Sequence, residues 1–498
     1  MKERRCGVLL PIFSLPSKYG IGAFSQEAYD FVDQLEEAGQ SYWQILPLGP
    51  TGYGDSPYQS FSTFAGNPYF LDLDSFIKKG WLTKEECELC HFGKEERYIA
   101  YDMIYQNRFP LLKKAYERSK IKEEKDFKDF CEREQDWLFD YALYMAIKEE
   151  KFDGKGFMEW DEEIRFRDPT VMKRYEKELE QTIEFYCFLQ YEFEKQWTKL
   201  KQYANQKGIQ IIGDIPIYVA FDSADTWANP ELFQFDDGGN PIKVAGCPPD
   251  AFSADGQLWG NPLYRWEYHK ETGYHWWMQR MKASFKWYDI VRIDHFRGFD
   301  EYYAIPYGDT TARNGRWEKG PGIELFETLK KELGEKEIIA EDLGFLTETV
   351  KELLKKSGYP GMKVLQFAFD SREESDYLPH NYERNSVVYT GTHDNNTIQG
   401  WYDEMTPEDQ QLSIDYMRNN FKDRENLHWD FIMLAMRSVS NLCIIPAWDY
   451  LGVDKSGRIN TPSTLGDNWK WRMEKEMFPK SILQKMKQSA RITGRLCQ

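Results

Sequence analysis

The chain has 498 residues, of which 82 are acidic and 64 basic, and its formal net charge at pH 7 is −18. This balance disfavours a nucleic-acid-binding protein, which needs a basic surface to neutralise phosphates. No apolar run approaches the roughly 18 residues of a membrane-spanning helix, and the start MKERRCGVLLPIF lacks the full apolar segment of a signal peptide. Eight irregularly spaced cysteines are typical of a reducing compartment. We therefore expect a cytoplasmic protein without nucleic-acid or membrane partners.

Short apolar segments typical of β-strands recur along the chain. Most are continuously apolar, as in parallel strands that are covered on both faces. Helical patterns lie between them, at 25–38 after the first strand and at 323–333 and 347–356 around the fifth. Eight parallel strands with intervening helices predict an α/β protein with a (β/α)8 TIM barrel. The expected strands are 7–12, 42–48, 210–219, 290–296, 337–343, 363–369, 386–390 and 442–447.

The spacing of these strands is uneven, which predicts insertions into a single barrel that spans residues 1–498. We expect a helical insertion at about 71–205, where lysine and glutamate recur at helical spacing. The segment at about 221–287 is rich in Gly, Pro, Asn and Trp, and we expect a loop-rich insertion over the active-site face. Only about 50 residues follow the last strand, too few for the ~100 residues of a C-terminal β-sandwich.

Four carboxylates stand at or just after the C-terminal ends of expected strands: Asp214, Asp294, Glu341 and Asp394. A single one of them is most simply explained as the cap of the following helix. In a barrel, however, these strand ends meet at one face, which is where active sites lie. Carboxylates that converge there repel one another unless they share protons, metals or cations. Together they predict a catalytic cluster.

Cationic groups occur in the same motifs. Arg292 precedes Asp294 by two residues, so both side chains project to one face of a strand. Its guanidinium favours the ionised form of Asp294, which suits a nucleophile, although a structural salt bridge has the same pattern. His393 adjoins Asp394 and either bonds a ligand hydroxyl or is a structural histidine; the residues alone favour neither.

A pair of carboxylates that act as acid and nucleophile is the equipment of glycoside chemistry. That chemistry would require Glu341 to keep a proton near neutral pH. The sequence does not give the distance between the carboxyl groups, so retention and inversion of the anomeric configuration both remain open. No HExxH pair or phosphate-binding glycine loop is present, and we expect no metal. We interpret the C-x-x-C-H match at 87–91 as structural, since it lies in the charged helical insertion.

Longer segments carry a family resemblance. They are GVLLPIFSLPSKYGIG (7–22), WQILPLGPTGYGDSPYQSFSTFAGNPYF (43–70), AGCPPDAFSADGQLWGNPLYRW (245–266), VRIDHFRGF, AEDLG, GTHDNNT and RINTPSTLGDNWKWR (458–472). Through nearly its whole length the chain resembles the 4-α-glucanotransferases of the α-amylase clan, also called amylomaltases or disproportionating enzymes. The shorter motifs are shared with many amylase relatives, whereas 43–70 and 245–266 are specific to this family.

The resemblance implies a retaining transfer of α-1,4-glucan segments between maltooligosaccharides or amylose-like glucans, with glucose as an acceptor. By it, Asp294 is similar to the nucleophile, Glu341 to the general acid/base and Asp394 to the third carboxylate, which holds sugar hydroxyls. It also implies a barrel without a C-terminal sandwich and no organic cofactor. The substrate-binding positions that it implies are Ser56, Tyr58, Asp214, Gln257, Trp259, Arg292, Asp370 and His393.

The sequence departs from the family pattern near Pro11, where many members have a His, and at Ala251, and the second departure matters for function. Ala251 stands where the family commonly carries Tyr, in a loop over the acceptor groove, and this affects acceptor stacking and the size of cyclic products. Two alternative functions remain. An α-glucan hydrolase or debranching relative on the same barrel would make only shorter products from maltotriose. A non-catalytic glucan-binding protein is disfavoured because all three expected carboxylates are intact.

Overall fold

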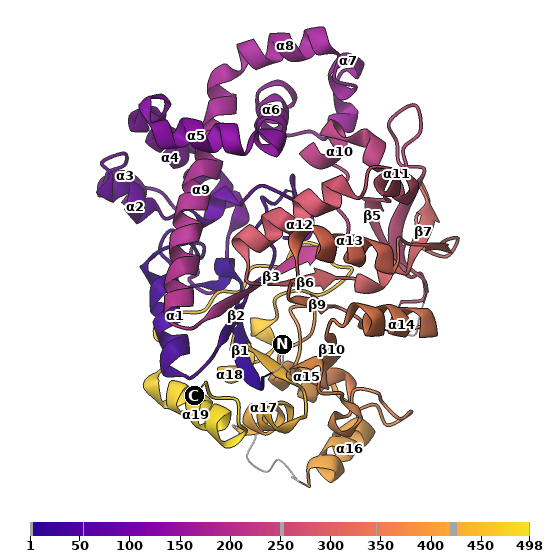
Figure 1. Cartoon of the computed structure of the whole chain (residues 1–498). Helices are drawn as coiled ribbons and strands as arrows, with labels where there is room; N and C mark the ends of the chain where they lie inside the picture. Colours follow the sequence, from indigo (N-terminus) through magenta and orange to yellow (C-terminus); the bar gives the residue numbers. More distant parts are fainter. Residues whose placement is uncertain (1–2, 53, 250–252, 345, 419–425, 498) are drawn as a thin grey trace.

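The computed structural model describes residues 3–52, 54–249, 253–344, 346–418 and 426–497. Its centre is an eight-stranded parallel sheet with the strand order β10-β11-β12-β1-β2-β3-β6-β9. The two end strands of this sheet meet where the N–H of Ala340 donates a hydrogen bond to the carbonyl of Pro360, with 3.0 Å from N to O. The sheet therefore closes into the predicted (β/α)8 barrel (Figure 1).

Each of the eight segments expected from the sequence contributes one barrel strand. The strand expected at 363–369, which is β10, ends at Val364 because Leu365–Phe367 form a 3-10 helix, η7. The backbone N–H of Gln366 in that turn donates to the carbonyl of Thr390, the residue just after the next strand. The barrel strands are β1 Arg5–Leu9, β2 Tyr42–Gln44, β3 Gln210–Pro216, β6 Ile290–Asp294, β9 Ile338–Ala340, β10 Gly361–Val364, β11 Ser386–Tyr389 and β12 Leu442–Pro446.

Helices cover the outside of the barrel. In the first of them, Ala28, Phe31, Val32 and Leu35 are buried, and their spacing forms a single apolar stripe. The expected helices at 25–38, 323–333 and 347–356 are all present. The helices associated with the barrel are α1 Gln26–Glu37, α12 His275–Trp287, α13 Ile323–Leu333, α14 Glu348–Ser357, α15 Ile398–Glu404, α16 Pro407–Met417, α17 Leu427–Arg437, α18 Ala447–Tyr450 and α19 Lys480–Ile492.

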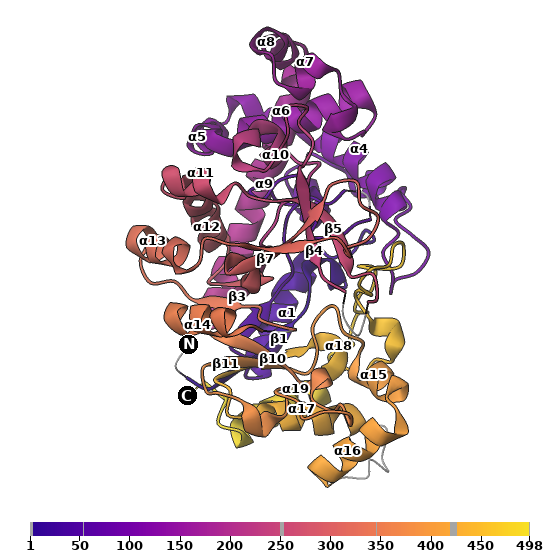
Figure 2. The same ribbon diagram turned by 90° about the vertical axis from the view of Figure 1, so that its right-hand side faces the viewer.

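Residues 71–205 contain eight α-helices in the described part of the chain. In both views the middle of this insertion lies at one end of the molecule, opposite α16 and α17 (Figures 1 and 2). Its last and longest helix, α9, runs back to the barrel and leads into β3. The helices are α2 Leu73–Lys78, α3 Lys84–Glu88, α4 Tyr101–Ser119, α5 Lys125–Arg133, α6 Gln135–Phe152, α7 Glu162–Arg165, α8 Pro169–Glu178 and α9 Glu180–Gln206.

The segment 221–287 is more regular than its composition suggested. Besides α10 Ala224–Ala228 and α11 Trp266–Glu271, it contains the strands β4 Lys243–Cys247 and β5 Gln257–Pro262. These pair with β7 Glu301–Pro306 and β8 Arg316–Lys319 in an antiparallel sheet of order β5-β4-β7-β8. Glycines within the two strands, Gly246 and Gly260, weaken the alternating pattern that would have revealed them. Strand β7 begins shortly after the C-terminal end of β6. The antiparallel sheet therefore lies over the face of the barrel at which the parallel strands end (Figure 2).

After β12, the described residues form the helices α18 and α19 with turns between them, and they contain no β-sandwich. Arg495, which is fully buried, ties this tail to the start of the chain. Its guanidinium donates to the carbonyl oxygens of Arg5 and Ser440, both at 2.9 Å. Within the described residues, no helix is long and apolar enough to cross a membrane.

Candidate active site

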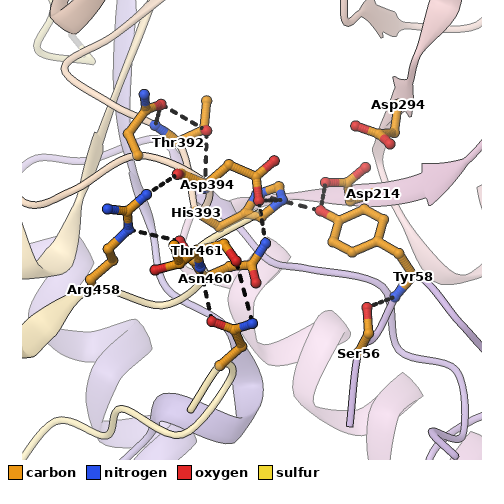
Figure 3. A network of polar contacts seen from close by, with 12 residues as sticks. Ser56, Tyr58, Asp214, Asp294, Thr392, His393, Asp394, Arg458, Asn460 and Thr461 are labelled. Atoms are coloured by element: carbon orange, nitrogen blue, oxygen red, sulfur yellow. Dashed lines mark hydrogen bonds and ion pairs between the residues drawn. The ribbon is translucent and has the colours of Figure 1, made fainter. Parts of the chain in front are cut away.

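The four carboxylates predicted from strand ends lie together at the C-terminal face of the barrel. Asp294 is the last residue of β6, Asp214 lies in β3, and Glu341 directly follows β9. The register of β3 and β6 places Asp214 opposite Arg292. Asp394 follows β11 on the other side of the barrel, and its carboxylate faces the same space (Figure 3).

A buried arginine joins two of these carboxylates. Nη1 of Arg292 lies 2.8 Å from Oδ1 and 2.7 Å from Oδ2 of Asp214, and Nη2 lies 3.0 Å from Oδ1 of Asp294. Burial lowers the pKa of Arg292, but the two carboxylates outweigh burial and raise it well above its usual value. The side chains of Arg292 and Asp214 are 4% and 0% exposed, whereas that of Asp294 is 31% exposed. Arg292 is therefore a fixed charge that leaves one side of Asp294 open.

Tyr58 connects this pair to His393. Its hydroxyl donates a hydrogen bond to Oδ2 of Asp214 at 2.8 Å, and its oxygen lies 3.4 Å from Nδ1 of His393. The two rings stack at 5.0 Å with an interplanar angle of 19°. Nε2 of His393 then lies 3.4 Å from Oδ1 of Asp394. Ser56 holds the backbone that carries Tyr58, since its hydroxyl oxygen accepts a hydrogen bond from the N–H of Tyr58. Figure 3 shows this chain of contacts.

Asp394 is held from the C-terminal part of the chain. Nδ2 of Asn460 donates to Oδ1 of Asp394 at 2.6 Å, and Arg458 donates to the carbonyl oxygen of Asp394 at 3.1 Å. The N–H of Asn460 also bonds the carbonyl of His393. The indole of Trp469 lies 5.9 Å from the rings of both Tyr58 and His393. Arg458, Asn460 and Trp469 are not among the predicted site residues, and their place in the motif at 458–472 is the only sequence signal for them.

Glu341 accepts two backbone hydrogen bonds, one on each carboxyl oxygen. The donors are the N–H of His295 at 2.7 Å and the N–H of Leu343 at 2.8 Å. His295 has a left-handed backbone (φ 56°), which turns the chain sharply after Asp294. Burial, and then the negative charge of Asp294, raise the pKa of Glu341 to about 8, although Arg292 and the two N–H groups oppose this rise. Glu341 thus keeps its proton near neutral pH.

Burial also raises the pKa of Asp294, and the positive charge of Arg292 opposes this rise. The two carboxyl groups consequently have different surroundings. Asp294 has a guanidinium at 3.0 Å, whereas Glu341 has only neutral backbone donors in direct contact among the contacts described. Such a division into an ion-paired carboxylate and a protonated carboxylic acid is the arrangement required by acid-assisted displacement at a sugar carbon.

Two of the implied substrate-binding residues lie on the antiparallel sheet. Trp259 and Gln257 are both in β5, and the indole N–H of Trp259 donates to Oε1 of Gln257 at 3.1 Å. The Trp259 ring meets the imidazole of His295 edge to face at 4.8 Å and 88°. Because His295 directly follows Asp294, this contact places Trp259 beside the carboxylates.

Asp370 has a different environment from the other predicted residues. Its carboxylate accepts from Nε of Arg372 at 2.8 Å and from Nη2 at 2.6 Å. These bonds lower the pKa of Asp370 to about 2, and the Arg372 side chain is 79% exposed. Among the described contacts, none joins Asp370 to the carboxylate cluster. The departure at Ala251 lies outside the described residues.

Comparisons with known proteins show the family of this chain. The family model described as 4-alpha-glucanotransferase matches residues 10–477. A 4-alpha-glucanotransferase of Clostridium butyricum is 49% identical, over 97% of this chain and 99% of the relative. One from Streptococcus pneumoniae is 50% identical, over 97% of this chain and 95% of the relative.

A solved structure shows the same fold. The amylomaltase from Streptococcus agalactiae in complex with acarbose superposes with a TM-score of 0.96 at 42% identity, covering 99% of this chain and 100% of that one. These matches extend over the barrel, both insertions and the C-terminal motif, and they confirm the resemblance seen in the sequence. The chain belongs to the 4-α-glucanotransferase family.

Proposed function

We propose that this glucanotransferase works by a retaining double displacement in which Asp294 is the nucleophile and Glu341 the general acid/base. The observation that carries the proposal is the contrast between the two groups. Asp294 is ion-paired with a buried arginine, and Glu341 has a pKa raised to about 8 beside it. A retaining mechanism needs two carboxyl groups that flank the scissile glycosidic bond, one ionised to attack C1 and one protonated to assist the leaving oxygen.

In the first step, an Asp294 oxygen forms a bond to C1 of the donor sugar while the bond from C1 to the glycosidic oxygen breaks. Glu341 gives its proton to that departing oxygen, which becomes the 4-OH of the leaving glucan. In the second step, Glu341 takes the proton from the 4-OH of an acceptor as its oxygen attacks C1. The bond between C1 and Asp294 then breaks, and both carboxyl groups return to their starting states.

The donor and acceptor that we propose are α-1,4-linked maltooligosaccharides or amylose-like glucans, with glucose as the smallest acceptor. The complex of the Streptococcus agalactiae amylomaltase with acarbose supports an oligosaccharide ligand in this fold. Asp394 is 47% exposed and hydrogen-bonded at one oxygen, so it retains acceptor capacity for sugar hydroxyls. Tyr58 and His393 offer stacked rings beside it. We assign Ser56, Asp214, Arg292, Gln257, Trp259 and Asp370 to substrate binding as well.

The raised pKa of Glu341 gives a prediction about pH. The first step needs the protonated form of Glu341, so we expect kcat/KM to change little between neutral pH and this pKa and to fall as pH rises through about 8. Well above that value the fall is about tenfold per pH unit. The measurement is the rate of glucose release from maltotriose across the alkaline range, with circular dichroism at each pH. A kcat/KM that stays constant to two units above this pKa, in folded protein, would contradict the assignment.

Trp259 gives a prediction about transfer against hydrolysis. Transfer requires that an oriented sugar reach the intermediate before water does, and an aromatic face beside Asp294 holds such a sugar. Trp259→Ala should raise the ratio of hydrolysis to transfer several-fold, measured as reducing ends gained per glucose released from maltotriose. Trp137→Ala, in helix α6 of the insertion, is the matched control and should leave the ratio unchanged. An equal ratio in all three proteins would remove Trp259 from this role.

The experiment that separates this proposal from the hydrolase alternative is a time course with maltotriose alone. Disproportionation produces glucose together with maltopentaose and longer chains, and the number of glycosidic bonds is conserved. A hydrolase produces glucose and maltose with nothing longer. The second result would overturn the proposed acceptor chemistry, and added glucose would then leave the product lengths unchanged.

A further inference from the structure

The segment 390–398, which carries His393 and Asp394, is fastened at both of its ends by one buried side chain. Asp449 lies just beyond β12, in α18, and is 1% exposed. Its Oδ2 accepts a hydrogen bond from the hydroxyl of Thr390 at 2.6 Å, and its Oδ1 accepts one from the N–H of Ile398 at 2.9 Å. Thr390 directly follows β11, and Ile398 is the first residue of α15. A single carboxylate therefore fixes how far apart the two ends lie.

The opposite side of the same segment is held by Gln366, which lies in η7 after β10. Its backbone N–H bonds the carbonyl of Thr390 at 3.2 Å, and its Nε2 donates to the carbonyl of Asn396 at 2.7 Å. Since β10 and β12 are the two neighbours of β11 in the barrel, the segment is clamped between them. The clamp consists of Gln366 on one side and Asp449 on the other.

Within the clamp, hydrogen bonds make the segment a single unit. Oδ1 of Asn395 accepts from the N–H and the hydroxyl of Thr392, at 2.8 and 2.9 Å. The Thr392 hydroxyl oxygen in turn accepts from the N–H of Asp394 at 3.2 Å. A displacement of either end therefore moves Asp394 rather than being absorbed by a flexible loop.

We propose that Asp449 is a positioning residue for glycosyl transfer, which acts through Thr390 and Ile398 to set where Asp394 meets the sugar ring. The inference rests on the sugar-holding role proposed above for Asp394. A carboxylate suits this position because it offers an acceptor to each of two donors. Among the described residues it has no cationic partner, and burial raises its pKa to about 7. Such a group is a costly way to stabilise a fold, and this favours a function in the geometry of the site.

The first test is Asp449→Ala against Asp449→Asn, with kcat and KM for maltotriose measured on folded protein. Loss of both bonds should let Asp394 shift, and a misplacement of about 1 Å costs up to 10²-fold in rate. We expect Asp449→Ala to lower kcat 10- to 100-fold with KM changed less than about threefold. Asp449→Asn can accept from Ile398 and donate to the Thr390 oxygen, so it should recover most of this kcat. A purely structural role would lower the yield and the melting temperature but not kcat per folded molecule.

The second test removes only one hydroxyl. Thr390→Val should lower kcat, and it should add nothing when combined with Asp449→Ala, because both changes break the same bond. Thr226→Val in α10 is the matched control: that threonine is equally buried and bonds the carbonyl of Phe221. It should leave kcat unchanged. If Asp449→Ala does not fold, the comparison of Thr390→Val with Thr226→Val decides the question, and equal kcat values would overturn the proposal.

Asp394→Asn, measured in parallel, distinguishes the sugar-holding role of Asp394 from the positioning role of Asp449. Loss of turnover in Asp394→Asn with wild-type kcat in Asp449→Ala and Thr390→Val would overturn the positioning role of Asp449 and leave the proposed function intact. Full turnover in Asp394→Asn would overturn the role of Asp394 and the positioning proposal with it. Loss of turnover in Asp394→Asn together with a lowered kcat in Asp449→Ala and Thr390→Val, and recovery in Asp449→Asn, supports both roles.

Discussion

Glu341→Gln should lose nearly all transferase turnover while it still binds maltooligosaccharide. The amide has nearly the shape of the carboxyl group, and its single oxygen can accept from one of the two N–H groups, of His295 and Leu343, that bond the two carboxyl oxygens of Glu341. It cannot give a proton to the departing oxygen or take one from the acceptor. General acid–base catalysis contributes about 10²–10⁴-fold per proton transfer. We therefore expect kcat to fall at least 10³-fold, as measured by glucose release from maltotriose.

Binding distinguishes this loss from a collapsed site. The Kd of maltohexaose, measured by calorimetry, should stay within about threefold of the wild type, because the substitution keeps the shape and the acceptor oxygen. The alkaline fall in kcat/KM should also be absent from the residual activity. Turnover within tenfold of the wild type would remove Glu341 from its assigned role.

Replacement of the buried arginine should affect both stability and activity. Arg292→Met leaves Asp214 fully buried without its cation and Asp294 without its ion pair. Removal of one partner from a buried ion pair typically costs about 3–5 kcal/mol. We expect the free energy of unfolding in urea to fall by about this amount, and turnover to become undetectable, since ionised Asp294 is no longer favoured.

Two further variants test whether the loss of stability comes from the buried charge that is left without a partner. The double variant Arg292→Met/Asp214→Asn no longer buries an uncompensated charge, so it should regain part of the lost stability but none of the activity. Arg118→Met, which breaks the exposed pair with Glu86, should shift the unfolding midpoint little. An equal loss of stability in Arg292→Met and Arg118→Met would show that the buried pair has no special role.

Much of the architecture follows from sequence patterns of a few residues. Most of the barrel strands are buried on both faces, so they leave a continuous apolar run in the sequence, such as Leu442–Pro446. The antiparallel sheet over the barrel mouth leaves no such run. Strand β5 buries only its last two residues fully and exposes 40% of Leu258, so neither an alternating nor a continuous pattern marks it. The exact ends of elements depend on tertiary contacts, as at η7, where the N–H of Gln366 bonds the carbonyl of Thr390 just after the neighbouring strand.

In the candidate site, too, some contacts follow from local sequence spacing and others depend on the tertiary fold. The approach of Arg292 to Asp294 follows from a spacing of two residues on one strand. In contrast, the bond between Asn460 and Asp394 joins residues that are 66 positions apart, and that between Tyr58 and Asp214 spans 156 positions. No periodicity encodes such contacts; only the folded chain brings these side chains together. The raised pKa of Glu341 depends likewise on burial and on Asp294, which are properties of the assembled site.

The most direct test of the proposed mechanism is to trap the glycosyl-enzyme. Glu341→Gln is incubated with α-maltotriosyl fluoride, whose fluoride leaves without acid assistance, while the second step lacks its base and is slow. Peptide mass spectrometry should then find one maltotriosyl group on the peptide that contains Asp294. Asp294→Asn/Glu341→Gln should remain unlabelled. A sugar attached to another carboxylate, such as Asp394, or consumption of the fluoride with inverted configuration and no label at any time, would contradict the mechanism.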